Sequence, residues 1–144
     1  MTIQKWILIL SGSLLVLVGG YILYSRTVVN ERVVQEIINN PEGNRAGIVM
    51  RLSLPTGKQI PVNYLRENGK VFAGADGPWW REIAATGSPV EMMIRGETLR
   101  GVATVILDDQ AYVDDVFSRL RPTVPKWLPD WANGKLIEVR LDRQ

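Results

Sequence analysis

The first 26 residues hold the feature that most limits how this chain can fold. From Trp6 to Tyr24 the sequence WILILSGSLLVLVGGYILY runs for 19 residues without a charge. As a helix it would rise roughly 30 Å, at about 1.5 Å per residue, which matches the hydrocarbon core of a bilayer. A cleaved signal peptide would carry a shorter apolar region and a cleavage site of small residues, and the bulky YILYSRTVV that ends this stretch offers none. We therefore expect residues 1–26 to form an uncleaved, single-span transmembrane anchor.

Aromatic and charged residues frame this stretch. Trp6, Tyr21 and Tyr24 lie near its ends, where amphipathic rings favour the membrane interface. Lys5 precedes it, and Arg26 follows it together with a further arginine at position 32. By a margin of one charge, this distribution favours a cytoplasmic location for the rest of the chain.

The basic character of the chain belongs to its N-terminal part. Lys5 and Arg26 are two of the 17 basic residues, and the remaining 15 equal the 15 acidic residues. A neutral domain without a basic run is a poor candidate for binding nucleic acid.

The chain contains neither cysteine nor histidine. This excludes disulfides, a thiol nucleophile, a Ser-His-Asp triad and a metal or haem held by histidine. If the protein is an enzyme, we expect a bound cofactor to supply the chemistry.

Residues 27–45 are expected to form a juxtamembrane helix and loop. Asn30 can cap a helix that begins at Glu31 and places Val33, Val34, Ile37 and Ile38 on one face. Two asparagines and Pro41 would end it.

Residues 46–144 read as a mainly β domain with short helices. Glu67–Gly69 and Arg95–Glu97 mark tight hairpins, and a short helix is expected after Pro78. A longer helix should be capped by Asp108 or Asp109 and run to about Leu120, with Ala111 among its core residues. The predicted strands are 47–54, 59–66, 71–75, 89–94, 98–107 and 135–141. This series of hairpins predicts a small antiparallel barrel.

Two adjacent tryptophans, Trp79 and Trp80, open the first short helix. Neighbours on a helix point about 100° apart, so both cannot fill one apolar stripe. One interpretation has Trp79 packing into the barrel and Trp80 covering a loop. The other has one of them forming the wall of a ligand pocket.

Three segments in this order, IPVNYLRENGKVFAGADG, GPWWREIAATGSPVEMMIRGETLRGVATVI and LIEVRL, resemble the deazaflavin-dependent nitroreductase family. The resemblance covers roughly Ala46 to Leu141. It implies a split β-barrel of the FMN-binding type, which holds a deazaflavin coenzyme or FMN and passes a hydride to a quinone or nitro compound. Some members of that family associate with membranes.

The resemblance also implies a set of site residues and no metal. The residues on the substrate side would be Trp80, Arg121 and Trp127. The residues that bind the cofactor would be Lys58, Pro61, Asn63, Tyr64, Ala73, Gly74, Ala75 and Trp79.

The chain departs from the family pattern at two places. The loop that usually holds the phosphate reads SLPTGKQ and keeps only Lys58 as an obvious cation, and the tyrosines usual near the C-terminus are missing. Trp127 and Trp131 could instead plug the barrel or face the membrane or a partner. Two functions therefore stay open: a membrane-anchored flavin- or deazaflavin-dependent reductase, and a non-catalytic accessory or assembly subunit of a membrane complex without a cofactor.

Overall fold

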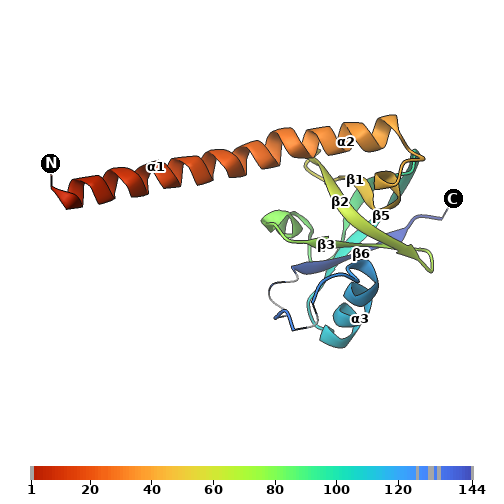
Figure 1. Ribbon diagram of the computed structural model, residues 1–144. Helices are drawn as coiled ribbons and strands as arrows, with labels where there is room; N and C mark the ends of the chain where they lie inside the picture. Colours follow the sequence, from red (N-terminus) through yellow and green to blue (C-terminus); the bar gives the residue numbers. More distant parts are fainter. Residues whose placement is uncertain (1, 126, 130–131, 133, 144) are drawn as a thin grey trace.

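The computed structural model describes residues 2–125, 127–129, 132 and 134–143. The chain begins as one continuous helical rod (Figure 1), made of α1 (Ile3–Tyr24), a π-helical turn η1 (Ser25–Val29) and α2 (Asn30–Asn39). One helix, Ile3–Asn39, is long and apolar enough to cross a membrane, and none of its most apolar window is buried in the protein.

Asn30 does not cap a new helix, which corrects the prediction from the sequence. Its φ of −62° and ψ of −42° are helical, and α2 begins without a side-chain cap. The cause is the π-helical turn, which keeps the backbone helical from α1 into α2. On α2, Val34 and Ile37 are buried against the barrel.

The rest of the chain forms a closed antiparallel barrel, which confirms the predicted fold class. Going round the barrel, the strands follow the order β1-β2-β3-β6-β5-β4. The strands are β1 (Val49–Ser53), β2 (Gln59–Glu67), β3 (Lys70–Ala75), β4 (Ser88–Ile94), β5 (Glu97–Ile106) and β6 (Lys135–Leu141). The helices of this part are η2 (Arg45–Gly47), η3 (Pro78–Glu82) and α3 (Gln110–Leu120).

Two tight turns define the hairpins β2–β3 and β4–β5. Asn68 and Gly69 have φ values of 51° and 72°, and Arg95 and Gly96 have 49° and 79°. Two successive residues with positive φ give the turn whose twist matches that of paired strands. Asn-Gly is a typical sequence for such a turn, whereas Arg95 is an unusual residue for the left-handed region.

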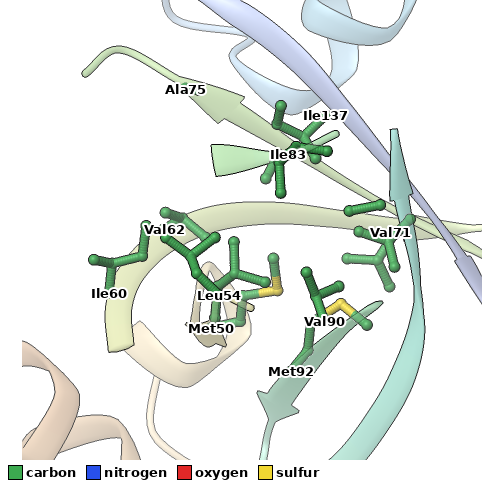
Figure 2. Packing of buried hydrophobic residues seen from close by; sticks show 14 of the residues in the cluster. Met50, Leu54, Ile60, Val62, Val71, Ala75, Ile83, Val90, Met92 and Ile137 are labelled. Atoms are coloured by element: carbon green, nitrogen blue, oxygen red, sulfur yellow. The ribbon is translucent and has the colours of Figure 1, made fainter. Parts of the chain in front are cut away.

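Alternate residues of every strand point into the barrel and form its core (Figure 2). The sulfur-containing side chains of Met50 and Met92 lie in this core and are fully buried. Aliphatic residues from the other strands complete it, among them Val71, Val90 and Ile137.

Helix α3 covers the outer face of β3 and β6 with a second apolar cluster. Phe72 and Leu136 contact the buried face of the helix, which comprises Val113, Val116, Phe117 and Leu120. As predicted, an aspartate caps the helix: Asp109 accepts a hydrogen bond from the backbone N–H of Tyr112 at 3.0 Å. Ala111, predicted to lie in the core, is exposed instead.

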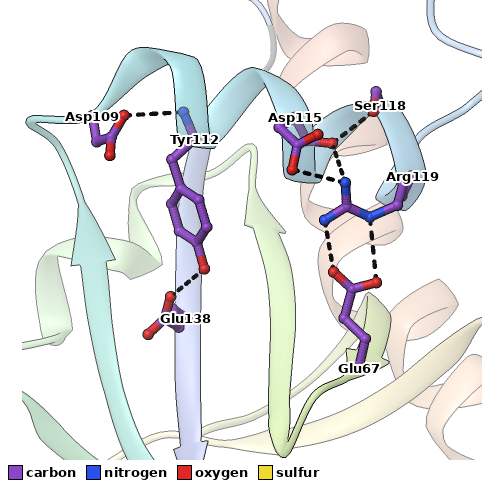
Figure 3. Close-up of polar contacts among 7 residues, drawn as sticks. All are labelled: Glu67, Asp109, Tyr112, Asp115, Ser118, Arg119 and Glu138. Carbon is purple, nitrogen blue, oxygen red and sulfur yellow. Dashed lines mark hydrogen bonds and ion pairs between the residues drawn. The ribbon is translucent and has the colours of Figure 1, made fainter.

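Polar contacts fix α3 at both ends (Figure 3). Arg119 donates to both carboxylate oxygens of Glu67, at 3.3 and 2.7 Å, and also contacts Asp115. The Tyr112 hydroxyl donates to Glu138 at 2.6 Å.

The helical rod runs past the barrel in a defined direction. The loop after α2 packs on the β4–β5 turn, where Pro41 lies against Gly96 and Gly47 lies against the Arg95 guanidinium. The connections 54–58 and 76–87, and the described residues of 107–134 other than α3, lie at the opposite end of the barrel, and α1 leaves from that end (Figure 1). We call this end, made of those three connections, the helix-exit end.

Candidate functional site

A long groove lies between α2, β2 and the end of α3. Its volume is about 1680 Å³. Seven of the eleven site residues predicted from the sequence line it: Lys58, Pro61, Asn63, Tyr64, Gly74, Trp79 and Arg121. The structure therefore brings together residues that lie up to 63 positions apart in the sequence, from Lys58 to Arg121.

The groove opens where β2 and β3 separate. The first half of β2 pairs with β1, and β2 pairs with β3 from Tyr64 onward. Hydrogen bonds run from Tyr64 N–H to the Ile48 carbonyl and from Leu54 N–H to the Lys58 carbonyl. They determine which residue pairs between β1 and β2 are hydrogen-bonded and which are not. With this alternation, Arg51 and Pro61 form a pair without mutual hydrogen bonds. Proline is tolerated there because its missing N–H would have pointed away from β1, toward the groove.

Gly74 lies on the outer face of β3, where the Arg121 guanidinium covers it. A Cβ added at Gly74 would lie 2.8 Å from the Arg121 Cζ and 3.0 Å from a ring carbon of Phe117. Arg121 also lies 5.2 Å from the Phe117 ring centroid and forms two hydrogen bonds with Asp76, at 2.8 and 2.9 Å. Gly74 has no side chain, and the planar guanidinium of Arg121 occupies the room that this leaves.

The two adjacent tryptophans have different neighbours. Both are half-buried against the barrel core, as expected for Trp79, and Trp80 therefore packs on the core as well. Trp79 lines the groove. Trp80 does not; two cations lie over its ring, with Arg81 at 5.3 Å and Lys135 at 6.0 Å from the centroid.

Cations are sparse along the groove. Lys58 is exposed and forms no ion pair within the described part of the chain. Arg119 lines the groove as well, but its bonds to the carboxylates of Glu67 and Asp115 hold its pKa above the ordinary arginine value. Arg45, close to Lys58 in sequence, pairs with Glu36 at 3.0 Å and does not line the groove.

The side chains of four predicted site residues do not line the groove, and the assignment of these residues stays a prediction. Ala73 and Ala75 point into the barrel core and are 0% and 2% exposed, since residues on either side of Gly74 face inward. Trp80 lies beside Arg81, and Trp127 is 79% exposed in the segment after α3. Trp131 lies outside the described residues.

Two features of the groove were not predicted from the sequence, namely its α2 wall and the partner of Arg121. Glu31, Val34 and Gln35 line the groove from α2. The apolar stripe on that helix predicted that the helix packs against another part of the protein, but the stripe did not identify that part. Asp76 follows β3 directly, and its pairing with a residue 45 positions later left no local signal.

Comparisons with known proteins bear on the fold. No family model matches the chain, and no curated protein matches it. Among solved structures, a FAD-binding protein from Mesorhizobium loti is similar, with a TM-score of 0.50 and 16% identity over 76% of this chain and 89% of that chain. An FMN-binding protein from Syntrophomonas wolfei subsp. wolfei is similar at a TM-score of 0.41 and 12% identity, over 90% of this chain and 94% of that chain.

The similarity to the FAD-binding protein supports a conclusion, and that conclusion concerns the fold alone. At 16% identity it shows a shared barrel fold, and a fold by itself does not specify a function. Membership of the deazaflavin-dependent nitroreductase family stays a prediction. The conclusion for this chain is a six-stranded antiparallel barrel of the kind found in flavin-binding proteins, preceded by a long apolar helix.

Proposed function

We propose that this protein is a membrane-anchored flavin-binding reductase whose cofactor lies in the groove along β2. The observation that carries the proposal is the convergence of seven predicted site residues in one groove, on a fold shared with a FAD-binding protein. The neighbour described as a FAD-binding protein supports a flavin, and the resemblance of the sequence supports FMN or a deazaflavin coenzyme.

The groove residues fit the ring of such a cofactor. Pro61 and Trp79 offer apolar surface, and the Asn63 side chain offers an amide for hydrogen bonding. Lys58 and Arg121 are the cations that would face a phosphate. When bound, a reduced flavin or deazaflavin supplies a hydride to an acceptor. The chain's own contribution would be to position both molecules and to exclude water.

The number of cations favours FMN over a deazaflavin coenzyme. The tail of a deazaflavin coenzyme carries several negative charges, and Arg121 is already paired with Asp76. FMN carries one phosphate, which Lys58 and a partly released Arg121 could neutralise.

A lipophilic acceptor suits the position of the groove. Ser25 and Thr27 line it, and they follow directly on the apolar stretch that ends at Tyr24. A membrane quinone or a nitro compound could reach the groove from the bilayer. We place the barrel domain on the cytoplasmic side, as the flanking charges favour.

A second candidate is a non-catalytic accessory or assembly subunit of a membrane complex. The observation that favours it is the Arg121–Asp76 pair over Gly74, which fills part of the space that a flavin ring would need. In that case the groove residues would stabilise the barrel and would bind no cofactor.

The test is a titration of the full chain, in detergent micelles, with FMN, FAD and a deazaflavin coenzyme, followed by tryptophan quenching. Lys58→Ala should weaken binding by about 1–3 kcal/mol, because one charge-assisted contact to phosphate is lost. Arg143→Ala, which removes an exposed cation at the other end of the barrel, is the matched control.

A second pair of variants distinguishes effects on cofactor binding in the groove from effects on the stability of the fold. Trp79→Ala should reduce both cofactor affinity and stability, whereas Trp80→Ala should reduce stability alone. Absence of saturable quenching in the wild-type chain up to about 100 μM, equivalent to roughly −5.5 kcal/mol, would rule out the reductase and favour the accessory subunit.

A further inference from the structure

The helix-exit end of the barrel carries half-buried and exposed aromatic side chains and exposed basic side chains. Three described tryptophans, Trp79, Trp80 and Trp127, belong to its connections. Trp127 is 79% exposed. An indole that is large, amphipathic and open to solvent is typical of a residue that meets a membrane interface.

The same end lies level with the end of the apolar helix. Ser25 and Thr27, one and three residues beyond Tyr24, line the same groove as Pro78 and Thr123. Figure 1 shows η3 (green) and the segment after α3 (blue) on the side toward which α1 projects. If α1 crosses a bilayer as far as Tyr24, these connections lie near the bilayer surface.

The helical rod supports a fixed placement of this end. Because α1, the π-helical turn and α2 are continuous, no loop separates the apolar span from the barrel. Val34 and Ile37 then hold α2 against the barrel. A hydrogen bond of 2.9 Å from Thr56 to Glu82 ties the β1–β2 turn to η3 within the helix-exit end.

From these observations we propose that the helix-exit end rests on the bilayer surface, with Trp127 in the headgroup region. This inference rests on the proposed transmembrane anchor. The contact places the mouth of the groove at the membrane surface.

The charges at this end decide which lipid the contact needs. Lys58, Arg81 and Lys135 are exposed there. Acidic residues offset them, namely Glu82, Asp108 and Asp109, while Asp76 is already paired with Arg121. With the signs nearly balanced, aromatic contact dominates over attraction to anionic lipid. A zwitterionic phosphatidylcholine surface should therefore suffice.

The experiment uses the absence of cysteine from the chain. Thr123→Cys places one thiol in the segment before Trp127, and Thr98→Cys places one near the opposite end; both positions are exposed. Each full-length variant carries an environment-sensitive fluorophore and is reconstituted in phosphatidylcholine vesicles that contain a headgroup spin-labelled lipid. We expect several-fold stronger quenching at position 123 than at position 98. Equal quenching at the two positions would overturn the proposal.

A second variant tests the role of Trp127. Adding Trp127→Ser to the Thr123→Cys chain should reduce the quenching toward that of the Thr98→Cys chain. Unchanged quenching would show that Trp127 does not make the contact. Vesicle flotation separates this inference from the anchor: a chain that does not float disproves the anchor and with it the contact, whereas one that floats without quenching at position 123 disproves the contact alone.

Discussion

Arg121 and Asp76 form a two-point ion pair, with Nη1–Oδ1 and Nη2–Oδ2 distances of 2.8 and 2.9 Å. The pair joins the C-terminal end of α3 to the residue that follows β3, and it lies over Gly74. Only 17% of the Arg121 side chain is exposed. Paired, partly buried guanidinium groups of this geometry are held more firmly than surface ion pairs.

This arrangement predicts that Gly74→Ala destabilises the protein. The new methyl group would lie 2.8 Å from Arg121 Cζ and 3.0 Å from a Phe117 ring carbon, so Arg121 must move. We expect a loss of about 1–3 kcal/mol in the free energy of unfolding, measured by denaturation in detergent. Gly77→Ala is the matched control, because its Cβ would meet only Trp79 Cδ1 at 3.7 Å among the described residues. Equal stability of the two variants would contradict the close packing at Gly74.

Removing the carboxylate of Asp76 should change how the groove binds phosphate. In Asp76→Asn the guanidinium of Arg121 loses its charged partner and becomes a better donor to an anion. We expect FMN to bind more tightly by about 1 kcal/mol, or roughly fivefold. Riboflavin has no phosphate and serves as the control ligand in the same titration. An equal gain for both ligands would show that Arg121 does not act through phosphate.

Tyr112 should titrate at high pH and make stability depend on pH there. Burial, together with the hydrogen bond to Glu138, raises the pKa of Tyr112 from 10.0 to about 12. Because the folded pKa exceeds the unfolded value, this stabilisation is complete below about pH 10 and is lost as the pH rises toward 12. The phenolate absorbance of the wild-type chain minus that of Tyr112→Phe isolates this titration.

Glu138→Gln provides the matched control for the tyrosine. It removes the negative charge beside the hydroxyl, so the pKa of Tyr112 should fall toward its ordinary value. In Tyr112→Phe, Glu138 keeps Lys70 as a partner at 3.2 Å. The loss of one hydrogen bond should then cost about 0.5–1.5 kcal/mol. An unchanged titration in Glu138→Gln would contradict the role of that carboxylate.

Two truncations separate the proposed anchor from the barrel. Deleting residues 1–24 should move the chain from carbonate-washed membranes to the soluble fraction and leave the barrel folded, because no residue of α1 is buried. Deleting residues 1–39 also removes Val34 and Ile37 from the barrel surface and should cost about 3–6 kcal/mol. Circular dichroism and thermal unfolding measure the difference. If the chain that lacks residues 1–24 stays in carbonate-washed membranes, the assignment of the anchor is wrong.

The sequence by itself determined the local elements of this protein. Alternation of apolar residues located the strands, and Lys135–Leu141 was predicted to the residue. Asn68-Gly69 specified its turn, and Asp109 specified the start of α3, because each acts within a few residues of itself. The apolar stretch gave α1 directly. For the site, the resemblance identified seven residues that the fold brings into one groove.

Only the tertiary structure decided how these elements meet. Barrel closure pairs β1 with β4 and β3 with β6, and no local pattern encodes pairings between strands so distant in sequence. No local pattern in the sequence predicted the Arg121–Asp76 pair over Gly74 or the continuous helix from α1 into α2 either. Asn30 has a side chain that favours a helix start, yet its backbone is helical because the π-helical turn runs from α1 directly into α2, whose Val34 and Ile37 pack on the barrel.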